Sequence, residues 1–125
     1  MILDSNLIMY AAKPAYPGLR RLIAARSPVV SAVRKIEVLG YHRLSVDDRQ
    51  QFEMFFAAAH VMPITDAVVA KAIELRQSRK RSLGDALIAA TALVFGLVLH
   101  THNVKDYEGI PGLVVIDPLA TGDPL

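Results

Sequence analysis

The 125-residue chain has no cysteine, so it can form neither a disulfide nor a thiolate metal site. This suits a reducing, cytoplasmic environment. Its first residues include no basic segment of the kind that opens a secretory signal peptide. The longest apolar stretch, residues 86–99, is too short to span a bilayer as a helix. We therefore expect a cytoplasmic protein with no membrane partner.

Several common functional motifs are also absent. The sequence contains no GxGxxG, no Walker A and no GxSxG pattern, so dinucleotide binding and serine-hydrolase chemistry lack support. The formal net charge is only +2, which does not by itself indicate a nucleic-acid ligand. Basic residues do cluster near acidic segments, however, as in Arg79-Lys80-Arg81 before Asp85. Such clusters suit an approaching polyanion, although solvated helix faces and ends are the more ordinary explanation of each single cluster.

The hydrophobic content of 53% predicts a substantial core, and we expect one domain over residues 1–125. Short apolar runs bounded by turn residues predict strands at residues 1–3, 28–31, 61–64, 97–101 and 113–116. Helical patterns lie between them, at residues 19–23, 32–44, 47–60, 66–78 and 83–95. Alternation of this kind indicates an α/β fold with a mainly parallel sheet covered on both faces.

Helix and loop boundaries are marked by local signals. Ser45 and Ser82 each precede an acid by three residues, which is typical of a capping box, and Thr65 opens a third helix. Gly96 is expected just beyond the end of the last long helix. Residues 13–18 are expected to form a loop, and residues 121–125 a tail.

Four carboxylates are the most informative residues present. Asp4, Glu37 and Asp85 each lie inside an apolar segment, and Asp106 follows another. A carboxylate among buried residues is costly unless it is paired or binds a metal. Asp4 ends the first predicted strand, and ligands of parallel sheets bind beyond the carboxyl ends of strands. Oxygen ligands of this kind suit Mg²⁺ or Mn²⁺.

Each acid also has a purely structural explanation. Asp4 could cap the helix that follows it, Glu37 could face solvent, and Asp85 could complete the capping box begun by Ser82. Two bare carboxylates about 4 Å apart repel by about 4 kcal/mol at an effective dielectric near 20, so acids gathered at one place should require a divalent cation. Asp66 and Asp117 are expected to serve a helix start and a turn.

Four motifs in this order resemble the PIN-domain family, and within it the VapC-type toxins of toxin–antitoxin pairs. They are Ile-Leu-Asp4-Ser-Asn6, then Ser31-Ala-Val-Arg-Lys-Ile-Glu37, then Gly-Asp85-Ala-Leu-Ile-Ala-Ala-Thr, and Thr101-His-Asn103-Val-Lys-Asp106-Tyr. The resemblance implies a three-layer α/β/α sandwich with a central parallel sheet. It also implies a Mg²⁺- or Mn²⁺-dependent endoribonuclease that acts on RNA, is restrained by an antitoxin and is commonly a homodimer.

Residue roles follow from matching positions to the family. Asp4, Glu37 and Asp85 match its three core acids, and Asn103 stands where many relatives have a fourth acid, so Asp106 could supply the missing charge. Arg34 stands where relatives often have a small hydroxyl residue. We expect the metal ligands to be Asp4, Asp85, Glu37 and Asn103, with Asp106 added to the catalytic set. Ser5, Asn6 and Thr101 would position these ligands, and Arg34, Arg81 and Lys105 would contact substrate.

Two other functions remain open at this point. The incomplete fourth acid could leave a PIN-like module that binds RNA or an antitoxin without cleaving. A phosphatase of the haloacid dehalogenase type also has an acid after its first strand, but it needs a second Asp where this chain has Asn6. Phe52, Phe55 and Phe56 share one helix face, which either belongs to the core or offers a groove to a partner helix.

Overall fold

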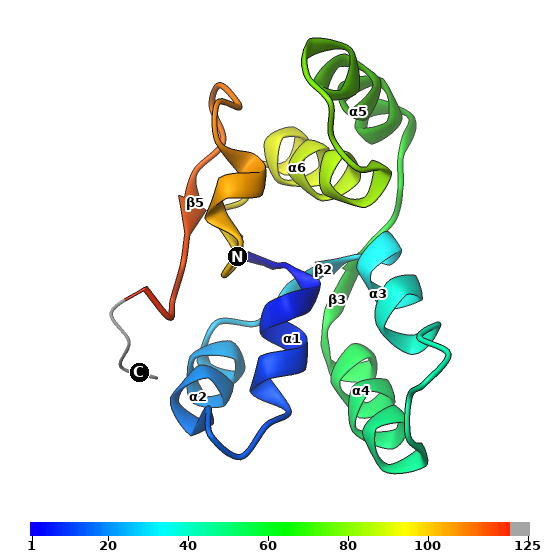
Figure 1. The fold of residues 1–125 in the computed structure, drawn as a ribbon, viewed down its shortest axis with the longest axis vertical. Helices are drawn as coiled ribbons and strands as arrows, with labels where there is room; N and C mark the ends of the chain where they lie inside the picture. Colours follow the sequence, from blue (N-terminus) through cyan, green and yellow to red (C-terminus); the bar gives the residue numbers. More distant parts are fainter. Residues whose placement is uncertain (121–125) are drawn as a thin grey trace.

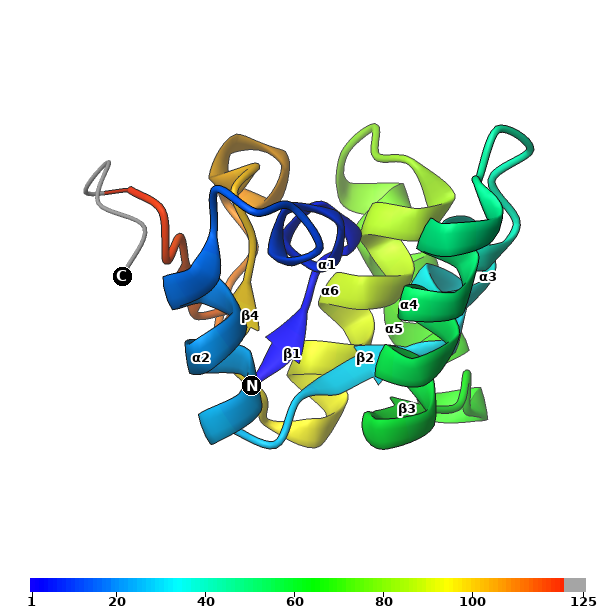
Figure 2. The same cartoon turned by 90° about the horizontal axis from the view of Figure 1, so that it is seen from below.

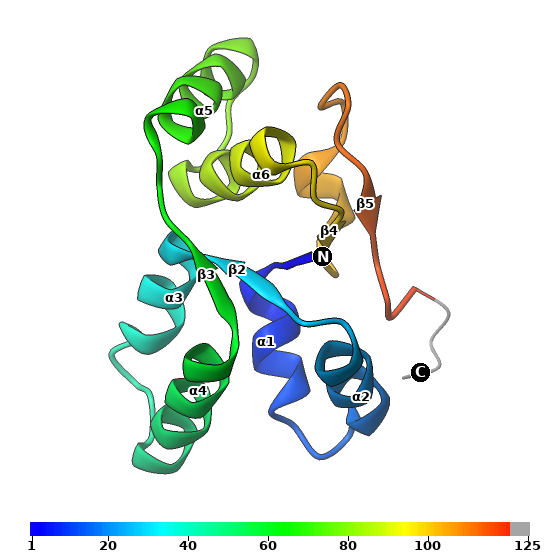
Figure 3. The ribbon, with the colours of Figure 1, turned by 180° about the vertical axis from the view of Figure 1, so that it is seen from behind.

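The sheet of the protein, described by a computed structural model over residues 1–120, has five parallel strands in the order β3-β2-β1-β4-β5. The strands are β1 (Ile2–Leu3), β2 (Val29–Ser31), β3 (His60–Met62), β4 (Leu99–His100) and β5 (Val115–Ile116). All five lie within two residues of their predicted positions. The first strand of the chain is thus the central strand of the sheet, with β3 and β5 at opposite edges (Figure 3). The predicted tail, residues 121–125, lies outside the described residues.

Helices cover both faces of this sheet, which gives the expected three layers (Figure 1). They are α1 (Ser5–Ala11), α2 (Pro17–Ala25), α3 (Ala32–Leu39), α4 (Val46–Ala58), α5 (Asp66–Ser78), α6 (Leu83–Phe95) and the short 3₁₀ helix η1 (Val104–Tyr107). Helices α5 and α6 pack together on one side, and α1, α2 and α4 lie on the other (Figures 1 and 2). No helix of residues 1–120 has the length and apolar character needed to cross a membrane.

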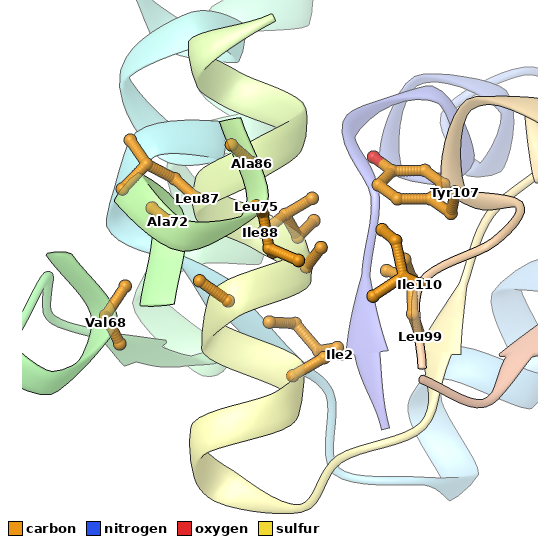
Figure 4. Close-up of a cluster of buried hydrophobic side chains, with 13 residues drawn as sticks. Ile2, Val68, Ala72, Leu75, Ala86, Leu87, Ile88, Leu99, Tyr107 and Ile110 are labelled. Atoms are coloured by element: carbon orange, nitrogen blue, oxygen red, sulfur yellow. The ribbon is translucent and has the colours of Figure 1, made fainter. Parts of the chain in front are cut away.

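Each face of the sheet has its own apolar core, because successive residues of a strand point to opposite sides. Ile2 packs with the side chains of α5 and α6, together with Leu99 and Ile110, as Figure 4 shows. Leu3 packs on the opposite face with residues of α1, α2 and α4, including Phe52 and Phe56. Both residues are almost fully buried. The central strand is therefore anchored from both sides.

The predicted capping residues are confirmed. Ser45, Thr65 and Ser82 each accept a hydrogen bond from a backbone N–H in the first turn of α4, α5 and α6, respectively. Gly96 ends α6 in the left-handed conformation, with φ of 65°, which favours glycine. The largest differences from expectation are two helix boundaries and one short helix, and each has a local cause.

Helix α2 begins at Pro17, inside the predicted loop, because proline is well suited to the first helical position. Helix α3 ends at Leu39 rather than at residue 44, since Gly40 follows and the chain then turns. The helix η1 was not predicted, because a single 3₁₀ turn has too few residues to show periodicity.

Candidate functional site

Asp4 lies at the carboxyl end of the central strand and is 4% exposed. It is also the N-cap of α1, where its Oδ1 accepts a hydrogen bond from the backbone N–H of Ser5 at 2.8 Å. Both explanations given for this residue are therefore compatible: the side chain caps a helix and faces the expected ligand edge. Its second oxygen, Oδ2, is left to bind other groups.

Two hydroxyl groups from distant parts of the chain bind that second oxygen. Thr101, just after β4, donates from Oγ1 to Asp4 Oδ2 at 2.9 Å. Tyr107, at the end of η1, donates from its hydroxyl to the same oxygen, also at 2.9 Å. Asn6 in turn donates from Nδ2 to Thr101 Oγ1 at 3.3 Å. The carboxylate of Asp4 is thus fixed on both oxygens, and Asn6 acts on it only through Thr101.

Arg34 lies at the centre of the acidic residues. It belongs to the first turn of α3, which is capped by Ser31 directly after β2. Its Nε is 2.9 Å from Asp4 Oδ1, and its Nη2 is 2.9 Å from Asp85 Oδ1. Its Nη1 donates to both oxygens of Glu37, at 2.8 and 2.9 Å. One guanidinium group, on a residue that is 5% exposed, therefore contacts all three predicted core acids.

The three acids differ in their access to solvent. The side chain of Asp4 is 5% exposed, that of Asp85 is 25% exposed and that of Glu37 is 42% exposed. Asp85 is at the third position of α6, and its backbone N–H donates to Ser82 Oγ at 3.1 Å. The capping arrangement is therefore real, but it uses the backbone of Asp85 and leaves its carboxylate free to bind Arg34. The cluster opens toward solvent at Glu37.

Gly84 lies where α6 closely approaches this cluster. A Cβ at residue 84 would lie 2.5 Å from Glu37 Oε1 and 2.7 Å from Arg34 Nη1. Any side chain there would push the ends of both residues away. The absence of a Cβ therefore shapes the space that the Arg34–Glu37 pair occupies.

Tyr107 completes the cluster and was assigned no role from the sequence. Its hydroxyl accepts from Arg34 Nη2 at 3.0 Å and lies 3.3 Å from Asp85 Oδ1. Figure 4 shows its ring at the end of the apolar cluster of α5 and α6, with the hydroxyl directed away from Ile110 and Leu99. The available sequence signal was its position directly after Asp106 in the last motif.

Charge and burial act together on the two central groups. Burial alone would lower the pKa of Arg34, but the surrounding acids, Asp4 first, outweigh it and raise that pKa. Burial and the negative charge of Asp4 raise the pKa of Tyr107 well above its usual range. Arg34 is therefore a permanent cation and Tyr107 a neutral hydroxyl donor at physiological pH. Arg34 lies between these acids and offsets part of the repulsion expected from their proximity.

Other predicted site residues lie apart from the cluster or contact it indirectly. Asn103 is exposed, and its backbone N–H donates to Thr101 Oγ1 at 3.0 Å. Asp106 and Lys105 are exposed on η1, and within residues 1–120 the side chain of Asp106 makes no hydrogen bond or ion pair with the cluster. Arg81 instead binds the end of α5, donating to the carbonyl of Leu75 at 2.7 Å.

Two predicted substrate contacts therefore need revision. Arg34 is buried against carboxylates, and Arg81 is bound to a helix end, so neither presents its guanidinium to a ligand in this arrangement. Of the three, Lys105 alone is exposed. Asp66 and Asp117 were expected at a helix start and a turn. Asp66 is in the first turn of α5, and Asp117 pairs with His102 and accepts a hydrogen bond from the backbone N–H of Leu119.

The donor set matches the chemistry of a hard divalent cation, since three carboxylates already surround one positive group. As the side chains stand, no group of three Asp, Glu or His residues within residues 1–120 is placed to hold a metal. The guanidinium of Arg34 instead contacts Oδ1 of Asp4, Oδ1 of Asp85 and the carboxylate of Glu37. Arg34 is thus the cation around which these three carboxylates gather.

Known proteins are similar to this chain in sequence and fold. The sequence model of the PIN-domain family matches residues 1–106. Ribonuclease VapC10 of Mycobacterium tuberculosis is 30% identical over 112 residues, which cover 83% of each chain. The range matched by the family model includes Asp4, Glu37, Asp85 and Asp106.

Solved structures agree. A toxin–antitoxin complex from Klebsiella pneumoniae contains a chain that is 26% identical, with a TM-score of 0.75, over 94% of this chain and 96% of that one. The DNA-bound VapBC of Salmonella typhimurium has a TM-score of 0.78 at 20% identity, covering 93% and 96%. FitAcB of Neisseria gonorrhoeae has a TM-score of 0.76 at 17% identity, covering 94% and 96%. Sequence, fold and site together show that the chain belongs to the PIN-domain family, as a VapC-type ribonuclease.

Proposed function

We propose that this ribonuclease is a Mg²⁺- or Mn²⁺-dependent endoribonuclease whose ion is held by Asp4, Asp85 and Glu37. The observation that carries the proposal is the gathering of these three acids, from separate parts of the chain, around one cation at the carboxyl edge of the sheet. When bound, such an ion supplies a water of lowered pKa and stabilises charge on the phosphoryl oxygens. Family membership leaves no basis for the phosphatase alternative.

The chain's own residues prepare the site for this chemistry. Thr101 and Tyr107 hold Asp4 Oδ2 by hydrogen bonds, which orients the carboxylate before any ligand arrives. Tyr107 remains a donor because its raised pKa keeps it protonated. Asn6 keeps Thr101 in place. These contacts reduce the reorganisation needed when substrate binds.

The exposed residues at this edge are proposed to complete the site. Asn103 is bonded through its backbone to Thr101, so it lies next to the hydroxyl that orients Asp4. Its amide oxygen is a suitable neutral ligand for the ion, and Asp106 adds negative charge three residues later. Lys105, exposed between them, is suited to contact an RNA phosphate as a point charge.

Cleavage of RNA by the purified chain tests the catalytic proposal. Digestion should occur with MgCl₂ or MnCl₂ and stop with a chelator. Asp117→Asn is a suitable control variant for Asp4→Asn, because Asp117 pairs with His102 and not with the cluster. Folded protein that binds metal and RNA but cleaves no RNA under any condition would instead establish the non-cleaving binding module.

An antitoxin partner is proposed on separate grounds. The similar solved chains come from toxin–antitoxin complexes. On this chain, a groove of about 600 Å³ lies among α1, α2 and α4 and is lined mainly by apolar residues, among them Ile8, Ile23, Phe52 and Phe55. An amphipathic helix of an antitoxin would fit such a groove through its apolar face. Phe52 and Phe56 are core residues, whereas Phe55 is only half buried, which supports a place for Phe55 in the proposed groove.

A homodimer is also proposed, on the resemblance to the family. Light scattering on the purified chain would test it, with a mass of about 27 kDa expected for two copies of the 13.6 kDa chain. A mass of one chain at all concentrations would reject the proposal.

A further inference from the structure

The strongest unexplained feature of the molecule is a positive side chain where the proposed function needs a metal ion. Arg34 is one of the six buried polar or charged residues within residues 1–120, and its guanidinium makes three ion pairs of 2.8–2.9 Å. Each pair uses a carboxylate that the proposed function assigns to the ion. A guanidinium and a metal ion would compete for these carboxylates, because both are cations that bind carboxylate oxygens.

Arg34 does not satisfy the cluster completely. Three carboxylates carry three negative charges, and one guanidinium cancels only one of them. In addition, its Nε lies 2.9 Å from Asp4 Oδ1 but has no hydrogen bond of adequate geometry within residues 1–120. A buried N–H without a good acceptor costs stability. The site therefore keeps excess negative charge and holds its arginine imperfectly.

The guanidinium of Arg34 can leave the cluster most easily on the side of Glu37. Glu37 has the most exposed carboxylate of the three, and it pairs with Arg34 from the next turn of the same helix. Exposed ion pairs are weak and easily exchanged for water. The contact at Glu37 is therefore the first to open.

We propose that Arg34 is a built-in counter-ion that competes with the divalent metal for Asp4, Asp85 and Glu37, and so holds the metal-free enzyme in an inactive closed arrangement. The inference rests on the proposed function. In the closed arrangement Arg34 binds the three acids, and in the open arrangement the metal does. Apparent metal affinity is then lowered by the fraction of molecules that are closed.

Calorimetric titration with MnCl₂ tests this on the full chain. Arg34→Ser removes the competitor, and Arg81→Ser is the matched control, because Arg81 is a partly buried arginine that binds a carbonyl instead of carboxylates. If the closed arrangement accounts for about nine-tenths of the molecules, Arg34→Ser should bind Mn²⁺ roughly tenfold more tightly. Arg81→Ser should bind like the unaltered chain.

Thermal melting of the same proteins gives a second readout. Without metal, Arg34→Ser should melt below the unaltered chain, because its acids have lost their counter-ion. Saturating MnCl₂ should raise its melting temperature by more than it raises that of the unaltered chain. Equal or weaker Mn²⁺ binding by a folded Arg34→Ser variant would overturn the competition while leaving a metal-dependent ribonuclease intact. Absence of binding by both proteins would instead overturn the proposed function itself.

The unaltered chain provides a test that does not depend on the variant's folding. The Nε–H of Arg34 can be followed by nuclear magnetic resonance during titration with MgCl₂. Its signal should shift and lose its protection from solvent exchange in step with Mg²⁺ binding. Binding of Mg²⁺ with an unchanged Arg34 signal would mean that the two cations coexist, and the proposal would fail.

Discussion

The acidic cluster and the groove among α1, α2 and α4 differ in how far the chain satisfies them itself. The cluster is charged and is occupied by a side chain of its own, since Arg34 contacts Asp4, Asp85 and Glu37. The groove is mainly apolar and open, with a volume of about 600 Å³. Buried charge without a partner is costly, whereas an open apolar groove is tolerated at the surface. The chain therefore supplies its own counter-ion to the acidic cluster. The groove can remain open until a separate molecule binds to it.

Loss of one acid should have the largest effect on RNA cleavage. Any structural change should be confined to the acidic cluster. We expect Asp4→Asn and Asp85→Asn each to lower RNA cleavage by about two orders of magnitude or more, because even groups that only orient a metal ligand cost about 10–100-fold. The helix cap at Ser82 should survive in Asp85→Asn, since Ser82 binds the backbone of residue 85. Rates of cleavage and circular dichroism of both variants provide the measurement.

A charge placed in the groove should weaken binding of the antitoxin and leave the acidic cluster unchanged. Phe55→Glu should reduce affinity for the antitoxin by about 2 kcal/mol or more, because it removes apolar contact and buries a carboxylate. Met54→Glu on the same helix is the matched control, since Met54 is 73% exposed and does not line the groove. Co-purification and titration with the antitoxin measure the difference. Equal loss in both variants would place the partner elsewhere.

Removal of one hydroxyl should weaken the cluster without changing its charge. Tyr107→Phe takes away the donor to Asp4 and the acceptor for Arg34, so the free energy of unfolding should fall by about 1–3 kcal/mol. Tyr41→Phe serves as control, because Tyr41 is 45% exposed. Denaturant unfolding compares the two. A stability unchanged in Tyr107→Phe would show that the hydrogen bonds around Asp4 contribute little.

Lowering the pH should have the smallest effect on stability. The residue responsible should lie outside both the acidic cluster and the groove. Burial lowers the pKa of His100 below its ordinary value of 6.5. Below about pH 6.5 the unfolded chain therefore binds a proton that the folded chain resists, so the free energy of unfolding should fall as pH falls. Melting temperatures between pH 7.5 and 5 should show a shallower slope in His100→Gln than in His42→Gln, whose histidine is exposed. Matching slopes would remove His100 as the source.

The sequence predicts local structure well where a residue type has a strong conformational or capping preference. Strand positions, serine caps and the turn at Gly96 follow from short-range rules and are confirmed. The gathering of Asp4, Glu37 and Asp85 was inferred from acids that lie within apolar segments and from motifs that resemble the PIN-domain family. Asp4 alone was placed by strand geometry, because ligands of parallel sheets bind beyond the carboxyl ends of strands.

The partner of these acids could not be inferred in the same way. Arg34 and Glu37 are one helical turn apart, but the contacts of Arg34 with Asp4 and Asp85 depend on how α3 packs against α1 and α6. Tyr107 reaches the cluster through a 3₁₀ turn that has no periodic signal. Side-chain pairing between distant elements is set by tertiary packing, and one sequence does not display it. The exposed position of Asp106 was missed for the same reason.

The placement of the first strand at the centre of the sheet has a consequence for biosynthesis. Asp4 leaves the ribosome early, yet its partner Tyr107 is made 103 residues later, and β1 cannot pair with β4 before then. At about 5–20 residues per second, the interval is roughly 5–20 s. Until it ends, the nascent chain lacks the two hydroxyl groups that orient Asp4 and two of the five strands, β4 and β5. The acidic cluster therefore takes its final form only when synthesis of the chain is nearly complete.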